Sequence, residues 1–235
     1  MNLTRLPPMA NDETAALLFV CCDQYLFRHR AKNGAMVYKF VSPAAVRAAF
    51  AEETIDTDWL PSNVRRWGMG KRGEWIVITF PPQKHRFSFV GEGDDARSTG
   101  AIELRPYEIP MPALAFFGYD QRYYLWAFKD AELKGDTPLF AAPLPNIDAN
   151  GAICFGSNVI PKASAKTIGE AWRLFVASPF TNHLVNGKSR HAERPDDIRK
   201  RLIRLAEKRR RVYPPDDLVS LNRTAEQVIN ETVRQ

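Results

Sequence analysis

Short runs of alternating apolar residues, separated by turn residues, dominate the first half of this 235-residue chain and constrain its fold most strongly. Alternation with a period of two is typical of half-buried β-strands. Asn33-Gly34 lies between two such runs and is a strong hairpin signal. We therefore expect an antiparallel β-meander, with strands at residues 17–22, 25–28, 36–41, 75–80, 85–90, 113–117 and 123–128.

The second half of the chain changes period. Residues 138–161 contain four prolines and no clear periodicity, which indicates a loop, either ordered or disordered. Apolar residues then recur at helical spacing in residues 168–177, preceded by the capping-box pattern Thr167 to Glu170. Further helices are expected at about 196–210 and, after Ser42-Pro43, up to about Glu53. Strands before helices predict an α+β fold, with the meander packed against helices.

Composition excludes several classes of protein. No stretch approaches the 18 or more apolar residues of a membrane helix, and residues 1–12 lack the features of a secretory signal, so we expect a cytoplasmic protein with no membrane partner. Three cysteines without metal-ligand spacing predict neither a disulfide framework nor a zinc site. The glycine-rich residues 68–73 precede a strand rather than a helix and are interpreted as a turn, so no cofactor is expected.

Positive charge is concentrated in one segment. Residues 188–211 contain eleven Lys or Arg residues against four acidic ones, whereas the whole chain has a net charge of +6. We expect three parts: a β-rich N-terminal extension (1–73), a core domain (74–187) and a basic helical segment (188–235). The basic segment is interpreted as a solvated face, a docking surface for an acidic protein, or a nucleic-acid contact from Lys188 to Arg211.

One cysteine lies in a distinctive motif. In residues 139–154, Pro145-Asn146-Ile147 is followed by Gly151 and Ile153-Cys154, with the asparagine eight positions before the cysteine. This segment resembles the active-site stretch of ubiquitin-conjugating enzymes, although Leu144 replaces the histidine of their His-Pro-Asn triplet. The resemblance implies a ubiquitin-conjugating-enzyme-like core in which Cys154 carries a ubiquitin-like protein as a thioester.

A closer resemblance is to protein B of the bacterial PRTRC system, which lacks that histidine and has one after the cysteine. His183 is such a histidine, and the surroundings of Trp59 and Trp67 are also similar. The resemblance implies a ThiF-like activating enzyme and a ubiquitin-like protein as partners. The chemistry of the residues agrees, since Asn146 is suited to stabilising an oxyanion and His183 to accepting a proton.

Other interpretations of these residues remain open. His183 is equally suited to capping a helix end, and Asn146 to shaping its loop. The chain is alternatively a non-catalytic docking or DNA-associated module, or, less favoured, a cysteine hydrolase that pairs Cys154 with His183. Cys21 and Cys22 are expected to be structural. The aromatic residues between 116 and 126 favour core packing over a surface for base stacking.

Overall fold

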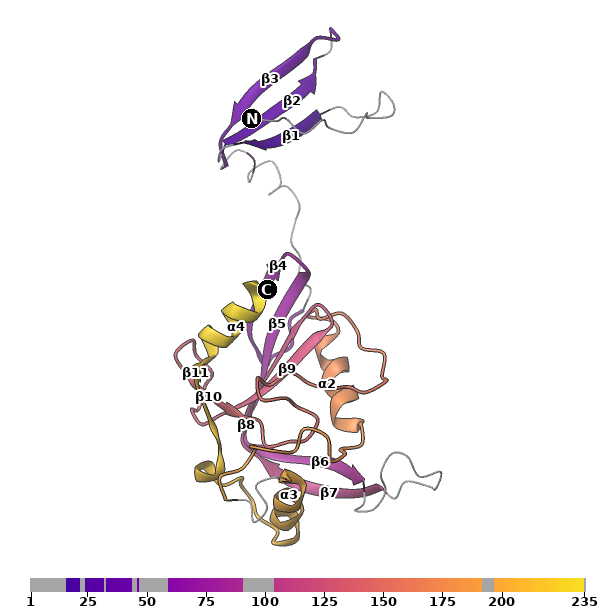
Figure 1. Ribbon diagram of the computed structural model, residues 1–235, viewed down its shortest axis with the longest axis vertical. Helices are drawn as coiled ribbons and strands as arrows, with labels where there is room; N and C mark the ends of the chain where they lie inside the picture. The colour runs from indigo at the N-terminus through magenta and orange to yellow at the C-terminus, as the bar shows by residue number, and fades with distance from the viewer. Residues whose placement is uncertain are drawn as a thin grey trace. The chain divides into compact units, whose positions relative to one another are not determined.

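The computed structural model describes residues 16–21, 24–31, 33–43, 46, 59–90, 104–191 and 197–234. The chain forms two compact units, Met1–Asp56 and Thr57–Gln235. Each unit has its own antiparallel strands (Figure 1). The α+β class and the antiparallel arrangement expected from the sequence are confirmed. No helix among the described residues is long and apolar enough to cross a membrane.

The first unit contains a three-stranded antiparallel sheet of β1 (Ala16–Cys21), β2 (Gln24–Arg30) and β3 (Met36–Val41). Gly34 has a φ of 82° in the turn between β2 and β3, a conformation that glycine adopts without steric cost. The Asn33-Gly34 hairpin is thereby confirmed. Most of the helix expected up to Glu53 lies outside the described residues, and so does Cys22.

The second unit is built on a six-stranded antiparallel sheet in the order β11-β10-β9-β8-β5-β4, with a separate ribbon of β6 and β7. The expected strands at 75–80 and 85–90 both form, but they lie in different sheets, since β5 pairs with β8 and β6 pairs with β7. Lys71 and Arg72 form the turn between β4 and β5, so the glycine-rich stretch is strand and turn. The bounds are β4 (Val64–Gly70), β5 (Gly73–Phe80), β6 (Gln83–Val90), β7 (Leu104–Met111), β8 (Ala113–Tyr119), β9 (Arg122–Phe128), β10 (Pro138–Ala141) and β11 (Ser220–Thr224).

Both faces of the large sheet are buried along its central strands. Along β8, Phe116 points into one hydrophobic cluster and its neighbour Phe117 into another, as the alternation of side chains along a strand requires. The first cluster also holds α2 and α3, and the second holds α4. Of the aromatic residues between 116 and 126, all are buried in the core except Tyr124, which is partly buried and packs against the second cluster.

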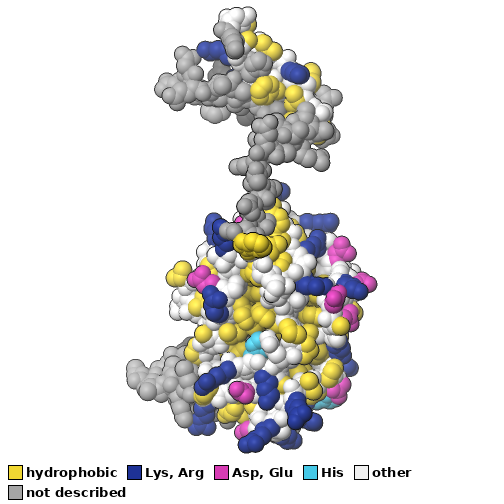
Figure 2. Space-filling view, turned by 180° about the vertical axis from the view of Figure 1, so that it is seen from behind, with side chains coloured by type: hydrophobic (Ala, Val, Ile, Leu, Met, Phe, Trp, Pro, Cys, Tyr) yellow, Lys and Arg dark blue, Asp and Glu magenta, His cyan; other side chains and the backbone are white. Residues whose placement is uncertain are grey.

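In the described part of the chain, three helices pack against these clusters: α2 (Ile168–Ala177), α3 (Ile198–Glu207) and α4 (Ala225–Arg234). Helix α2 has the predicted bounds and buries four of the five apolar residues that the helical spacing predicts, while the fifth, Val176, is only partly buried. Trp172 stacks on Phe80 at 4.2 Å between ring centroids. Helix α3 packs on β7. Lys and Arg side chains gather at the lower end of the second unit in Figure 2, at the height of α3 in Figure 1.

The predicted capping box at the start of α2 is wrong. Thr167 is the N-cap, but its side chain makes no capping hydrogen bond. Its hydroxyl donates to the carbonyl of Lys162 and pairs with the hydroxyl of Ser164 instead. The backbone already turns before Thr167, because Ile168 N–H donates to Ser164 O at 3.0 Å. That earlier turn draws the hydroxyl away from the helix.

A buried carboxylate holds the C-terminal region together. Asp217 is fully buried and accepts hydrogen bonds from the Ser189 hydroxyl, His191 N–H, Arg201 Nε and the Tyr213 hydroxyl. Burial alone would raise the pKa of Asp217, but these hydrogen bonds outweigh it and hold the pKa below its usual value. The network joins residues 189–191 and α3 to the turn before β11.

Candidate functional site

The segment that carries Cys154 is ordered and anchored in the core. Leu144 and Ile147 are fully buried in the first hydrophobic cluster. Ile147 bridges Ile153 in antiparallel fashion, and Ile153 N–H donates to Tyr123 O in β9 at 2.9 Å. The ordered alternative for residues 138–161 is therefore correct for this part of the loop. Leu144, the residue at the position of the triplet histidine, serves as a core side chain.

Position 151 requires a glycine, because its backbone lies very close to a buried side chain of the core. Its φ is 94°, and a Cβ atom here would lie 2.2 Å from Trp126 Nε1. That nitrogen donates a hydrogen bond to the carbonyl of Asn150 at 2.8 Å. Trp126 is fully buried and has no room to move. A side chain at position 151 would thus displace the turn before Cys154.

Asp148 and Lys188 hold that turn from two sides. The Asp148 carboxylate accepts hydrogen bonds from the N–H groups of Asn150 and Ala152, each at 2.8 Å. The Lys188 ammonium donates to the Asp148 carbonyl at 3.1 Å and is 4% exposed. Burial lowers the pKa of Lys188 to about 8, against the opposing attraction of Asp148. Lys188, expected on the basic surface, is instead a buried support of the cysteine loop.

Two backbone hydrogen bonds connect all three predicted site residues. Cys154 N–H donates to Asn146 O at 2.8 Å, and Asn146 N–H donates to His183 O at 2.9 Å. The Cys154 side chain is exposed. Asn146 has a φ of 59°, a conformation that asparagine tolerates better than most residues. Residues separated by 29 positions in the sequence, Cys154 and His183, are thus brought to one place through Asn146.

The Asn146 side chain is oriented by Thr181, a residue that the sequence alone did not single out. Thr181 donates from its hydroxyl to Asn146 Oδ1 at 3.2 Å and accepts from His183 N–H at 3.2 Å. Asn146 Nδ2 donates to Pro179 O at 3.4 Å. A threonine two residues before a histidine is a signal for this hydroxyl-to-backbone turn. The turn is anchored by Phe180, which bridges β6 at Phe89.

His183 does not cap α2. The C-cap is Ser178, whose N–H donates to Phe175 O and whose hydroxyl donates to Leu174 O. The exposed His183 side chain makes no hydrogen bond within the described part of the chain. The contacts therefore do not support the interpretation of His183 as a helix cap.

The arrangement lacks the contact expected of a cysteine hydrolase. No hydrogen bond joins the Cys154 thiol to the His183 imidazole among the residues that the structure describes. In the same residues, no group of three or more His, Cys, Asp or Glu side chains is placed to hold a metal ion. An exposed thiol on a residue whose backbone is hydrogen-bonded to Asn146 is suited to accepting and releasing an acyl group.

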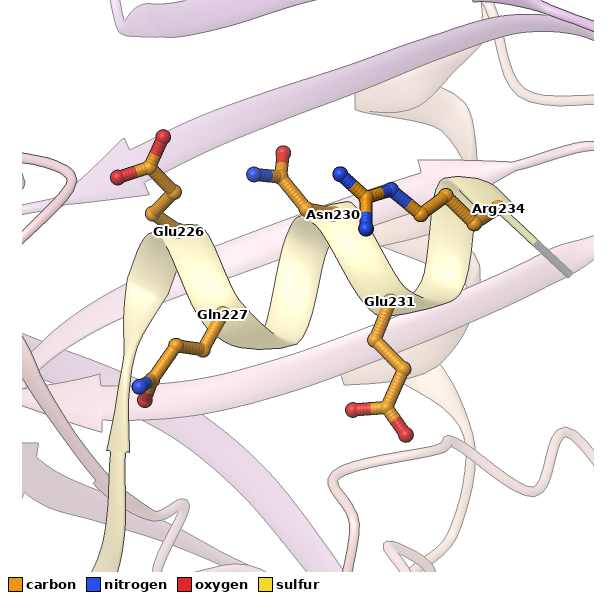
Figure 3. Close-up of a pocket in the computed structure, with 5 residues that line it drawn as sticks. All are labelled: Glu226, Gln227, Asn230, Glu231 and Arg234. Atoms are coloured by element: carbon orange, nitrogen blue, oxygen red, sulfur yellow. The ribbon is translucent and has the colours of Figure 1, made fainter.

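A surface hollow on α4 is separate from this site. All five residues that line it project from that single helix (Figure 3). Asn230 accepts from Arg66, and Glu231 pairs with Arg223. None of the lining residues carries a thiol, hydroxyl or imidazole. The hollow is lined by Glu226, Gln227, Asn230, Glu231 and Arg234.

Comparison with known families gives one result. The family model described as Prokaryotic E2 family D matches residues 37–221, a range that includes Asn146, Cys154 and His183. No curated protein and no solved structure matches the chain. The closer resemblance to PRTRC protein B and the ubiquitin-conjugating-enzyme-like layout of the core both stay predictions.

Proposed function

The chain belongs to prokaryotic E2 family D, and from this membership and the exposed Cys154 thiol we propose that it is a ubiquitin-conjugating-type carrier. Family membership indicates a ubiquitin-conjugating-like role. In the proposal, a ThiF-like activating enzyme of a bacterial PRTRC-type system supplies a ubiquitin-like protein. Cys154 holds that protein as a thioester and transfers it to an amine.

The placement of Cys154 supports the proposal most directly. Its side chain is exposed, while its backbone is fixed to Asn146 and, through Asn146, to His183. A carrier must admit a bulky protein thioester and then an acceptor amine, so an open position is needed more than a buried pocket. A fixed backbone holds in one place the Cβ atom that carries the reacting sulfur.

Loading is an exchange between two thiols. The Cys154 thiolate attacks the carbonyl carbon of the thioester on the activating enzyme, and a new C–S bond forms. The old C–S bond breaks, and the departing thiolate takes up a proton. Because one thioester replaces another, the exchange is nearly balanced in free energy and needs little activation of the thiol.

Discharge makes greater demands on the site. The amine nitrogen attacks the thioester carbonyl, giving a tetrahedral oxyanion that collapses to an amide and expels the Cys154 thiolate. The Asn146 amide, positioned by Thr181, donates a hydrogen bond to the oxyanion. The exposed imidazole of His183 accepts the proton that the attacking amine loses.

The thioester provides the first test. Full-length protein incubated with its ThiF-like activating enzyme, the ubiquitin-like protein and ATP should gain an adduct that dithiothreitol removes. Cys154→Ala should abolish the adduct because the sulfur is lost, and Cys154→Ser should give an adduct that resists dithiothreitol because an oxyester forms. Non-reducing gel electrophoresis and intact mass spectrometry measure both outcomes.

The other cysteines provide the matched control. A Cys21→Ser, Cys22→Ser double variant should charge like the unmodified protein. An adduct that survives Cys154→Ala would move the reactive thiol to Cys21 or Cys22 and contradict the proposal. Folded protein that never charges would favour the alternative function, a non-catalytic docking module.

The role of His183 is tested by separating loading from discharge. His183→Gln should leave thioester charging and the melting temperature nearly unchanged, because the imidazole makes no hydrogen bond in the described structure. Transfer to free lysine should slow by roughly 100-fold, the usual effect of losing a general base. Unchanged discharge by the charged variant would contradict the role.

A further inference from the structure

Seven of the eleven cations of residues 188–211 fall into two groups with different environments. Lys188 is buried against the Asp148 carbonyl. Arg199 pairs with Asp197 at 2.8 Å, and Arg201 pairs with the buried Asp217 at 3.0 Å. These three side chains serve the fold and are not available to a partner.

The second group, Lys208 to Arg211, faces solvent. All four side chains are exposed and follow one another directly after α3. None of the four side chains makes a hydrogen bond or an ion pair with another described residue. We call Lys208, Arg209, Arg210 and Arg211 the cationic turn.

The cationic turn contains a residue that its backbone does not favour. Arg210 N–H donates to Leu205 O at 3.0 Å and Arg209 N–H to Ala206 O at 2.8 Å, the two hydrogen bonds of a Schellman motif. Arg209 has a φ of 50° at the position where glycine is usual. The turn therefore carries an arginine in a backbone conformation that costs free energy. Exposure to solvent alone does not explain why an arginine occupies this position.

The surroundings of the cationic turn fit a polypeptide better than a nucleic acid. Arg209 lines a groove between α3 and the β6–β7 ribbon, and the other charged or aromatic residues of its lining are Lys84, Tyr107, Glu108 and Glu207. With two cations and two carboxylates, the groove does not present the continuous positive surface that a phosphate backbone requires, whereas Tyr107 and the 65%-exposed Val212 beside the turn offer apolar contacts. Duplex DNA presents phosphates at regular spacing, but a peptide mixes acidic and apolar side chains.

We propose that the cationic turn and the adjoining groove bind an acidic protein segment that carries apolar side chains. The cations attract its carboxylates and speed its association, and Val212 and Tyr107 contact its apolar residues. This inference does not depend on the chemistry of Cys154. A carrier and a docking module would both use the surface.

The test uses the full chain and a fluorescein-labelled twelve-residue peptide of Glu and Leu. Fluorescence anisotropy should show saturable binding that weakens as salt rises from 50 to 300 mM. Arg209→Gln, Arg210→Gln, Arg211→Gln should weaken binding at least fivefold. The control Lys71→Gln, Lys134→Gln, Arg234→Gln removes equal charge from exposed positions elsewhere and should change binding less than twofold.

A second variant separates binding from folding. Arg209→Gly should raise the melting temperature by about 2 °C and still weaken peptide binding, because it relieves the backbone and removes a cation. Equal losses in the two triple variants, or no peptide binding at all, would overturn the proposal. If the protein binds random duplex DNA more tightly than the peptide, nucleic acid and not an acidic segment is the ligand of this surface. Four phosphate contacts would then give a slope of about −3.6 in log affinity against log salt.

Discussion

At the scale of single residues, Thr181 decides where the Asn146 amide points. Replacing Thr181 by Val keeps the shape of the side chain but removes its hydrogen bonds to Asn146 Oδ1 and from His183 N–H. Charging of Cys154 should be unchanged, while discharge to lysine should slow about tenfold, less than the roughly 100-fold expected when an oxyanion donor is lost entirely. Single-turnover discharge assays measure this effect.

Thr181→Ser is the matched control, because it restores the hydroxyl without the methyl group. It should recover most of the discharge rate. Failure of Ser to rescue discharge, or equal losses in charging and discharge, would show that residue 181 matters only for folding of the turn.

At the scale of elements, Lys188 supports the cysteine loop from the segment before α3. Its pKa is lowered from 10.5 to about 8 in the folded protein, so the unfolded chain binds this proton more tightly. Burial of the charged Lys188 amine therefore destabilises the folded protein by its full amount below pH 8. This destabilisation declines as the pH rises toward 10.5. The free energy of unfolding should therefore rise by about 1 kcal/mol more in the unmodified protein than in Lys188→Met between pH 7 and pH 9.

Urea unfolding at the two pH values, with reductant present, measures this difference. Lys134→Met is the control, since Lys134 is exposed. It should show the same pH dependence as the unmodified protein. A Lys188→Met profile that runs parallel to the unmodified one would contradict the buried, weakly basic amine.

At the scale of the whole molecule, the second unit contains both hydrophobic clusters and the complete candidate site. A chain that begins at Thr57 should therefore unfold cooperatively on its own. Its main thermal transition should lie within about 3 °C of the corresponding transition in the full chain, since a loss of 1 kcal/mol corresponds to roughly 2–4 °C at this size. Calorimetry measures both. A broad transition without a heat-absorption peak would contradict this independence.

Local sequence pattern determined the elements whose signal lies within a few residues. Helix α2 has the bounds that its apolar spacing predicts, and the β8–β9 hairpin follows from alternating residues around a polar turn. The interval between Asn146 and Cys154 is by itself enough to indicate the candidate site. These elements can be predicted from the sequence, because backbone periodicity and turn preferences depend on residues that are neighbours in the chain.

The tertiary structure decided what depends on residues far apart in the chain. Neither the separation of β6 from β5, nor the elements β4, β7, β10, β11 and α4, nor the Thr181 contact was predicted. The sequence pattern predicts surface charges at Lys188 and Arg201, yet the fold places Lys188 under the cysteine loop and pairs Arg201 with Asp217. A side chain's environment is set by long-range packing, because burial and hydrogen-bond partners come from segments that the local pattern does not specify.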